Sequence, residues 1–269
     1  MISFSPRRCG KLFLFFLKTK AKTILLWCIG LFGIMFLYMI LFPSMKEMAQ
    51  MKFDSMPKEL MQFMGMESMQ DMGNYMHYFG MIFQIWLIVI SFFVSSFSGG
   101  LIVQEEKRKT IEYLYAMPVS RFDIYFAKVA TAFLAVLAVV ACTGISAMIC
   151  GAAVGGETYQ ASELMLIVKL SGFIPFFFLA AAFLLCGLSA SFGASAANGC
   201  VLVLYLLGYL GAILEKDGEW LTYFSPFECF SPQKILSENW SVPAFSAYLA
   251  LFFVLIAAGA FFYHRRDFR

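Results

Sequence analysis

The side chains that most often carry out catalysis are sparse in this sequence. It has two histidines, His77 and His264, which fall at opposite sides of the apolar segments described below. Neither a histidine-pair zinc site nor a Ser/His/Asp triad assembles from such a pair. The phosphate-binding pattern GxxxxGK[ST] is absent, and the apolar segments contain no paired aspartates. We therefore expect no catalytic, cofactor-binding or metal-binding residue in this chain.

Methionine sulfur is the one potential metal ligand present in quantity. Residues 43–78 contain ten methionines, and His77 lies in the same segment, directly after the last of them. Thioethers bind Cu(I), so one interpretation is a copper site. The alternative is an amphipathic lid, with a short helix between Pro57 and Gly65, whose methionines pack on lipid, a partner or an apolar cargo. Five acidic residues are interspersed and no ligand spacing repeats, which favours the lid. The ten residues are Met45, Met48, Met51, Met56, Met61, Met64, Met66, Met69, Met72 and Met76.

The composition indicates an integral membrane protein. Of 269 residues, 61% are hydrophobic and 14% are charged, whereas soluble domains have about 25% charged residues. We predict an all-α fold with six transmembrane helices in a single transmembrane domain covering residues 1–269. The predicted spans are residues 23–42, 79–103, 124–154, 166–189, 198–214 and 243–263, each long enough to cross about 30 Å of hydrocarbon.

The basic residues predict the orientation in the membrane. Residues 1–22, 104–128 and 264–269 hold fourteen of the 20 Lys and Arg but only five of the 17 Asp and Glu. The positive-inside rule therefore places both termini and the 104–121 loop in the cytoplasm. Outer segments are then expected at residues 43–78 and 215–242, the latter as short helices or as a plain surface loop.

Three smaller predictions follow from local composition. Residues 1–22 interleave basic and aromatic side chains, which is typical of an interfacial helix, with a disordered basic tail as the alternative. Lys128 is expected to extend toward the cytoplasmic interface. Most of the seven cysteines lie in apolar runs, and Cys229 stands without an obvious partner, so no disulfide framework is expected.

The loop at residues 104–121 is the most distinctive segment. It has seven charged residues between two apolar runs that have none. Ile111, Leu114 and Tyr115 have the i, i+3, i+4 spacing of one helical face. Pro118 ends that helix, and Ser120 with Asp123 predicts a capping box that starts the next one. We predict a rigid cytoplasmic knob that docks into a partner, rather than a loop that is merely solvated.

This loop resembles the inner loop of ABC-2 type permeases, the membrane subunits of ABC exporters. The stretch EExxxxTIExLxxxPVSRxxxxxxK carries the resemblance, and it departs at Lys109, where glycine is frequent in the family. The resemblance implies a coupling helix that seats in a separate ATPase subunit. The matching positions are Glu105, Glu106, Thr110, Ile111, Glu112, Leu114, Pro118, Ser120, Arg121 and Lys128, with Tyr115 added from the apolar face.

The resemblance also implies the partners. Two ATPase copies would bind ATP and Mg²⁺ and drive two permease copies, most simply a homodimer, in a bacterial plasma membrane. The turn at residues 191–198 would touch the same ATPase. Membrane lipid surrounds the assembly, and no nucleic acid partner is expected.

The substrate is predicted from the character of the spans. The spans have no polar track, and the 32 phenylalanines and 12 tyrosines of the whole chain make the interior apolar and aromatic, which favours a hydrophobic or amphipathic cargo. The best match among ABC-2 exporters is the peptide-toxin and antimicrobial-peptide group, including the exporters of phenol-soluble modulins. Lipid, drug or copper-related export stays open, as does a membrane sensor or immunity protein that transports nothing.

Overall fold

The computed structural model describes residues 4–52, 73–110, 118–189, 193–214 and 218–266. Within these ranges the chain is helical, and it contains six helices long and apolar enough to cross a membrane. The predicted all-α membrane fold is thus confirmed. The predicted helix between Pro57 and Gly65 and the apolar face at Ile111, Leu114 and Tyr115 lie outside the described residues.

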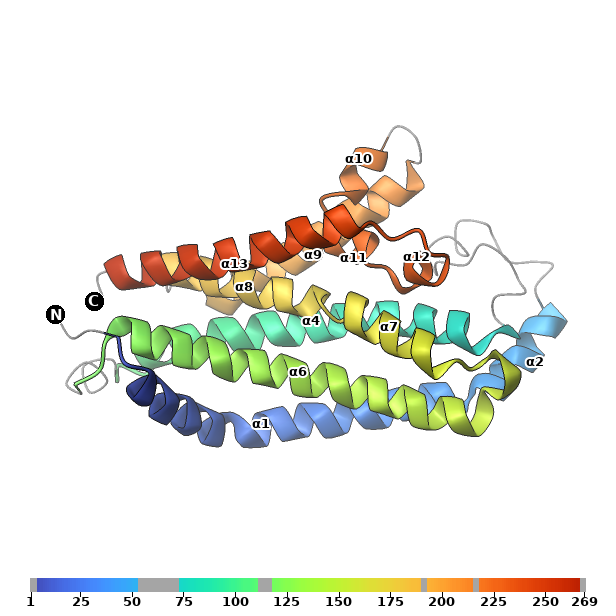
Figure 1. Cartoon of the computed structure of the whole chain (residues 1–269), viewed down its shortest axis with the longest axis horizontal. Helices are drawn as coiled ribbons and strands as arrows, with labels where there is room; N and C mark the ends of the chain where they lie inside the picture. The colour runs from blue at the N-terminus through green and yellow to red at the C-terminus, as the bar shows by residue number, and fades with distance from the viewer. Residues whose placement is uncertain (1–3, 53–72, 111–117, 190–192, 215–217, 267–269) are drawn as a thin grey trace.

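The long helices run side by side in one bundle, with both termini at the same end (Figure 1). The first three are α1 (Pro6–Ile40), α4 (Tyr75–Lys107) and α6 (Arg121–Val154). The fourth span consists of α7 (Ala161–Ser171) and α8 (Ile174–Leu188), and α9 (Gly193–Ile213) and α13 (Val242–Arg265) are the last two. Short α2 (Phe42–Lys52) and η3 (Gly156–Thr158) lie at the end away from the termini.

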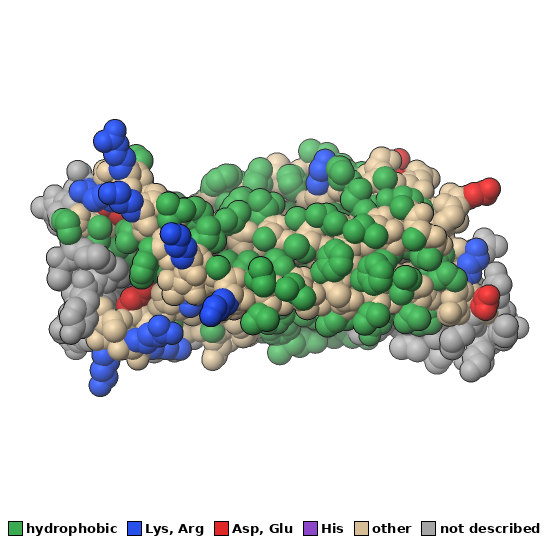
Figure 2. Space-filling model, turned by 90° about the horizontal axis from the view of Figure 1, so that it is seen from below, with side chains coloured by type: hydrophobic (Ala, Val, Ile, Leu, Met, Phe, Trp, Pro, Cys, Tyr) green, Lys and Arg blue, Asp and Glu red, His purple; other side chains and the backbone are tan. Residues whose placement is uncertain are grey.

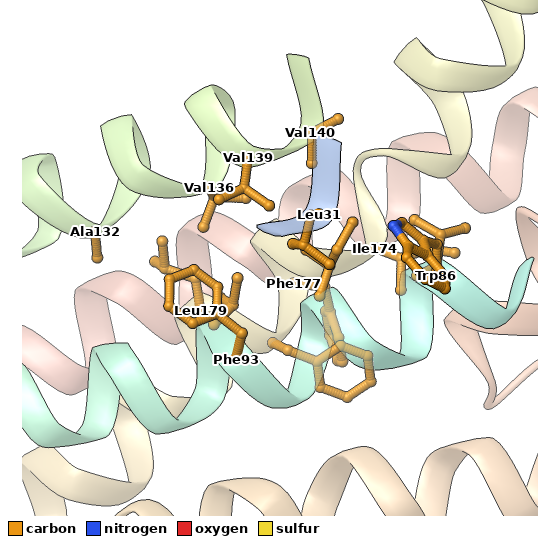
Figure 3. Packing of buried hydrophobic residues seen from close by; sticks show 14 of the residues in the cluster. Leu31, Trp86, Phe93, Ala132, Val136, Val139, Val140, Ile174, Phe177 and Leu179 are labelled. Atoms are coloured by element: carbon orange, nitrogen blue, oxygen red, sulfur yellow. The ribbon is translucent and has the colours of Figure 1, made fainter. Parts of the chain in front are cut away.

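The core lies where α4 and α8 are enclosed by the other helices. Val136, Val139 and Val140 of α6 face Leu31 of α1 and Leu179 of α8 (Figure 3). Many side chains on α1, α9 and α13 are instead exposed and apolar. Hydrophobic residues cover the middle of the face seen in Figure 2, and Lys and Arg gather at the end that carries the termini. This pattern suits a protein whose solvent is lipid at the middle and water at the ends.

Two glycines bring α8 and α13 close together toward the end of the bundle that carries the termini. A Cβ on Gly187 would lie 2.9 Å from the Gly259 carbonyl oxygen, and one on Gly259 would lie 2.4 Å from the Tyr125 hydroxyl. Tyr125 donates that hydroxyl to the Ile256 carbonyl oxygen at 3.0 Å. Small residues at such crossings are what allow membrane helices to approach backbone to backbone.

The fourth span differs from the continuous helix expected over residues 166–189. It is broken between Ser171 and Ile174, because Pro175 has no N–H for the preceding turn. At the break, Ser171 Oγ donates a buried hydrogen bond to the Phe230 carbonyl oxygen at 2.7 Å. This bond ties the break in the fourth span to Phe230, which lies in the segment that follows α9.

Other boundaries also differ from those expected. Residues 6–40 form one continuous helix in place of an interfacial helix followed by a separate span. At about 1.5 Å per residue this helix is roughly 50 Å long, longer than the hydrocarbon layer, so its basic start extends beyond it. Pro43 falls in the first turn of α2, and α1 ends before it, at Ile40. The second cytoplasmic turn is shorter than residues 191–198, since α9 begins at Gly193.

The outer segment after α9 forms three short helices that we call the outer cap: α10 (Glu219–Thr222), α11 (Pro226–Cys229) and α12 (Pro232–Leu236). Phe227 and Phe230 are buried, whereas Phe224 is exposed. Gln84 Nε2 donates to the Phe227 carbonyl oxygen at 3.3 Å. Because Gln84 lies nine residues inside α4, the outer cap reaches roughly 14 Å below the outer end of that helix.

Candidate functional site

The predicted coupling loop joins α4 to α6, and the structure describes both of its ends. Glu105 and Glu106 lie in the last turn of α4, and Thr110 follows it. Pro118, Ser120 and Arg121 lie at the start of α6. Glu112, together with the three apolar-face residues, belongs to residues 111–117, which are outside the described part of the chain.

The end of α4 has a Schellman motif. The Thr110 N–H donates to the Glu105 carbonyl oxygen at 2.8 Å, and the Lys109 N–H donates to that of Glu106 at 3.0 Å. This motif places the residue after the C-cap in the left-handed region, and Lys109 has φ 55°. Glycine adopts that conformation without steric cost. The departure from glycine at Lys109 therefore costs local stability but keeps the turn.

The start of α6 has the predicted capping box. Ser120 Oγ accepts from the Asp123 N–H at 3.0 Å, and Asp123 Oδ2 accepts from the Ser120 N–H at 3.0 Å. Asp123 does more than cap the helix. Its Oδ1 accepts from the Ser5 N–H at 2.8 Å, and Oδ2 also accepts from Arg8 Nε at 3.2 Å. The fully buried carboxylate of Asp123 thus ties the start of α6 to the start of α1.

A buried ion pair joins the two helices that flank the loop. Lys128 of α6 is fully buried, and its ammonium pairs with Glu105 of α4. It also donates to the Ile102 carbonyl oxygen at 3.2 Å. The expectation that Lys128 extends to the interface is therefore wrong, because a carboxylate one helix away gives the ammonium a partner inside the bundle.

The C-terminal end of α13 completes the arrangement. Arg266 pairs with Glu106 and donates to the Cys186 carbonyl oxygen at 2.8 Å. Arg121 donates from Nη1 to the carbonyl oxygens of His264 and Arg266, each at 2.7 Å. The Phe122 ring stacks on His264 with centroids 4.7 Å apart. Both ends of the loop are thus bonded to α13.

We call these groups the cytoplasmic clamp: Ser5, Arg8, Glu105, Glu106, Ser120, Arg121, Asp123, Lys128, His264 and Arg266. The clamp brings together Glu105, Glu106, Ser120 and Arg121 of the predicted site, and their bonds run within the chain. In the sequence, Arg8 and Arg266 indicated only the orientation of the chain in the membrane, and their ion-pair partners were not predicted. The signal that could have pointed to such pairing is a lysine in an otherwise uncharged run, which needs an acid nearby.

The described residues contain no cluster of histidine, cysteine or acidic side chains suited to a metal ion. All seven cysteines are free. His77 of α4 pairs with Gln233 of α12, with its Nδ1 3.2 Å from Gln233 Oε1, at the opposite end from His264. The two histidines therefore take part in structural contacts at separate ends of the molecule.

A family model agrees with this architecture over almost the whole chain. The model describes the C-terminal domain of the multidrug efflux system permease Rv1217c, and it matches residues 12–264. The chain belongs to this family. As a member of the Rv1217c permease family it is a multi-pass transport subunit, in line with its six spanning helices. No curated protein and no solved structure gives a match.

Proposed function

We propose that this chain is the membrane subunit of an ATP-driven exporter whose cytoplasmic loop at residues 111–117 docks a separate ATPase. The observation that carries the proposal is the cytoplasmic clamp. Both ends of the loop are held by hydrogen bonds and ion pairs to α1 and α13, so a displacement of the loop moves helices. A solvated loop has no need of such anchoring.

We infer that the energy source is external to the chain. The sequence lacks a phosphate-binding loop, and the ionisable groups of the clamp are paired with one another. A carrier driven by protons or ions depends on ionisable groups that are free to change state within the membrane. ATP and Mg²⁺ would therefore be bound by the partner, and the resemblance to ABC-2 permeases supports two ATPase copies with two copies of this chain in a bacterial plasma membrane.

The proposed cargo is an amphipathic or hydrophobic compound moved outward. The family description names multidrug efflux, which favours small amphipathic drugs. The peptide-toxin group stays a prediction of the loop resemblance alone. The apolar, aromatic spans suit either cargo. They do not suit a sugar or a simple ion.

The first test is copurification. The chain is expressed with its candidate ATPase subunit, and the two are isolated through a tag on the chain. We expect wild type to retain the ATPase and Leu114→Asp to release it, because a charge on the docking face opposes burial. Phe4→Asp, which alters an exposed aromatic residue at the same end, is the control and retains the ATPase. If Leu114→Asp also retains it at wild-type yield, the docking proposal is wrong.

A further inference from the structure

The outer cap contains a glutamate that has no role in the proposed coupling to the ATPase. Glu228 is the third residue of α11, and its side chain is only 23% exposed. Burial raises the pKa of this carboxyl above its ordinary value, and the nearby Lys234 ammonium opposes that effect. A carboxylate held in an apolar setting at the outer end of a transport bundle is costly unless it has a partner.

The helix α9 approaches the outer cap closely at this point. A Cβ on Gly208 would lie 2.5 Å from Ser225 Oγ and 2.8 Å from Glu228 Cγ, so both side chains lie against the backbone of α9. Ser225 is fully buried, and its Oγ has no hydrogen-bond partner among the described residues. The Gln84 Oε1 atom is likewise buried without one, although Gln84 Nε2 donates to the carbonyl oxygen of Phe227, two residues after Ser225. Two buried polar oxygens thus lack a partner within the described part of the chain at this point.

Aromatic residues are present on the elements that pack near Glu228. The Phe227 ring stacks on Phe178 at 5.3 Å and meets the edge of Tyr205 at 5.6 Å. On the outer side, Cys229 Sγ is 3.5 Å from the Thr222 carbonyl oxygen, which brings α10 beside α11. Exposed Trp220 and Phe224 flank Thr222, with ring centroids 6.1 Å apart. Faces of such rings attract cations.

Lys234 is a replaceable partner for Glu228. Its Nζ is 3.5 Å from Glu228 Oε2, longer than the 2.7–2.9 Å typical of a strong charge-assisted hydrogen bond, and its side chain is 41% exposed. A lysine stem has four rotatable carbons, so the ammonium is able to swing into water. Another cation could then take its place at the carboxylate.

We propose that the outer cap holds a recognition site for aromatic organic cations, in which the Glu228 carboxylate binds the positive charge in place of Lys234 and aromatic residues of the cap contact the aromatic groups. This inference rests on the proposed export function and names the charge class of its substrate. An anionic substrate would be repelled.

The test is binding of radiolabelled tetraphenylphosphonium to the purified full chain in nanodiscs. Wild type binds saturably. Glu228→Gln, which keeps the shape and removes the charge, weakens binding by about tenfold or more. Lys234→Gln, which removes the competing ammonium, tightens it several-fold. Glu157→Gln is the matched control, because Glu157 is an exposed glutamate at the same end, in η3, and its loss leaves the dissociation constant unchanged.

The opposite effects of the two variants separate a ligand site from a structural ion pair. If the pair only stabilises the cap, Glu228→Gln and Lys234→Gln change binding in the same direction or leave it unchanged, and the proposal is overturned. Absence of saturable binding to wild type also overturns it. Gel filtration and thermal unfolding of each variant confirm that the fold persists, and Glu228→Asp, which keeps the charge, retains binding.

The outcome is independent of ATPase docking. Binding is measured on the chain alone, so Glu228-dependent binding without ATPase copurification would contradict the proposed function and leave the site standing. Conversely, ATP-driven efflux of a neutral dye, together with binding that does not depend on Glu228, would support the proposed function and overturn the site.

Discussion

The ion pair between Lys128 and Glu105 is the residue contact on which the cytoplasmic clamp depends most. Both side chains are nearly or fully removed from solvent. Removing one member of a buried pair leaves an uncompensated charge, which typically costs about 3–5 kcal/mol, whereas replacing both is much less destabilising.

We therefore expect Lys128→Met to lower the thermal unfolding midpoint of the purified chain markedly. The double variant Lys128→Met with Glu105→Gln recovers most of the loss. A double-mutant cycle measures the coupling between the two positions. If the destabilisation of the double variant equals the sum of the two single destabilisations, the two side chains are not coupled and the ion pair is contradicted.

Lys109 adopts a backbone conformation that glycine prefers. With φ 55° in a Schellman motif, a non-glycine residue is strained by roughly 1–2 kcal/mol. Lys109→Gly is expected to raise the unfolding midpoint, offset in part by the greater freedom of glycine in the unfolded chain. Lys109→Ala removes the charge but keeps the Cβ, so it brings no such gain. Equal unfolding midpoints for Lys109→Gly and Lys109→Ala would show that the backbone at this position is not strained.

The pKa of Glu228 gives the outer cap a defined pH dependence. Burial raises that pKa above 4.5, so the carboxyl gains its proton at a higher pH than usual. Tetraphenylphosphonium does not titrate. Its binding to wild type should weaken as the pH falls and the Glu228 carboxyl takes up a proton, and binding to Glu228→Gln should stay flat. A falling curve for both proteins would rule out Glu228 as the titrating group.

At the scale of elements, the sequence predicts helices well and their interruptions poorly. The uncharged apolar runs predicted all six spans, and Ser120 with Asp123 predicted the start of α6 at the correct residue. The break in the fourth span was missed although Gly172 and Pro175 stand beside it. Hydropathy does not register a missing backbone donor, because the surrounding side chains are equally apolar.

Long-range partners could not be predicted from local spacing. Asp123 was recognised as a cap, but its bonds to Ser5 and Arg8 depend on α1 packing along α6. Arg266 reaches Glu106 because α13 and α4 both pack against α8. Charge counts predicted the side of the membrane on which these groups lie, whereas their pairing follows from the packing of the bundle.

The crossing of α8 and α13 provides a prediction at the scale of elements. A methyl group at Gly259 would meet the Tyr125 hydroxyl and lie 3.1 Å from the Phe183 carbonyl oxygen. Gly259→Ala should destabilise the chain by about 1–3 kcal/mol, because the overlap forces the helices apart. Gly199→Ala on α9, where a Cβ meets no atom within 4 Å, is the control. The comparison of unfolding midpoints tests the contact, and matching midpoints for the two variants would contradict it.

At the scale of the whole molecule, two specialised ends are joined by one apolar bundle. The cytoplasmic clamp ties the two ends of the proposed coupling loop to α1 and α13, and the outer cap reaches into the bundle beside the broken fourth span. α13 touches both, since Arg121 binds its cytoplasmic end and Tyr248 donates to the Tyr223 carbonyl oxygen at 2.9 Å near its outer end. A displacement of the loop is therefore expected to reach the outer cap through α13.

The most direct test of this account is drug-stimulated ATP hydrolysis by the reconstituted complex of the chain with its ATPase. Tetraphenylphosphonium should stimulate hydrolysis by the wild-type complex. Arg121→Ala removes the bonds between the loop and α13, so the ATPase should still copurify while the stimulation is lost. Arg265→Ala, which removes an exposed cation at the end of α13, should keep the stimulation. Undiminished stimulation of the Arg121→Ala complex would contradict the claim that the clamp couples the loop to the bundle.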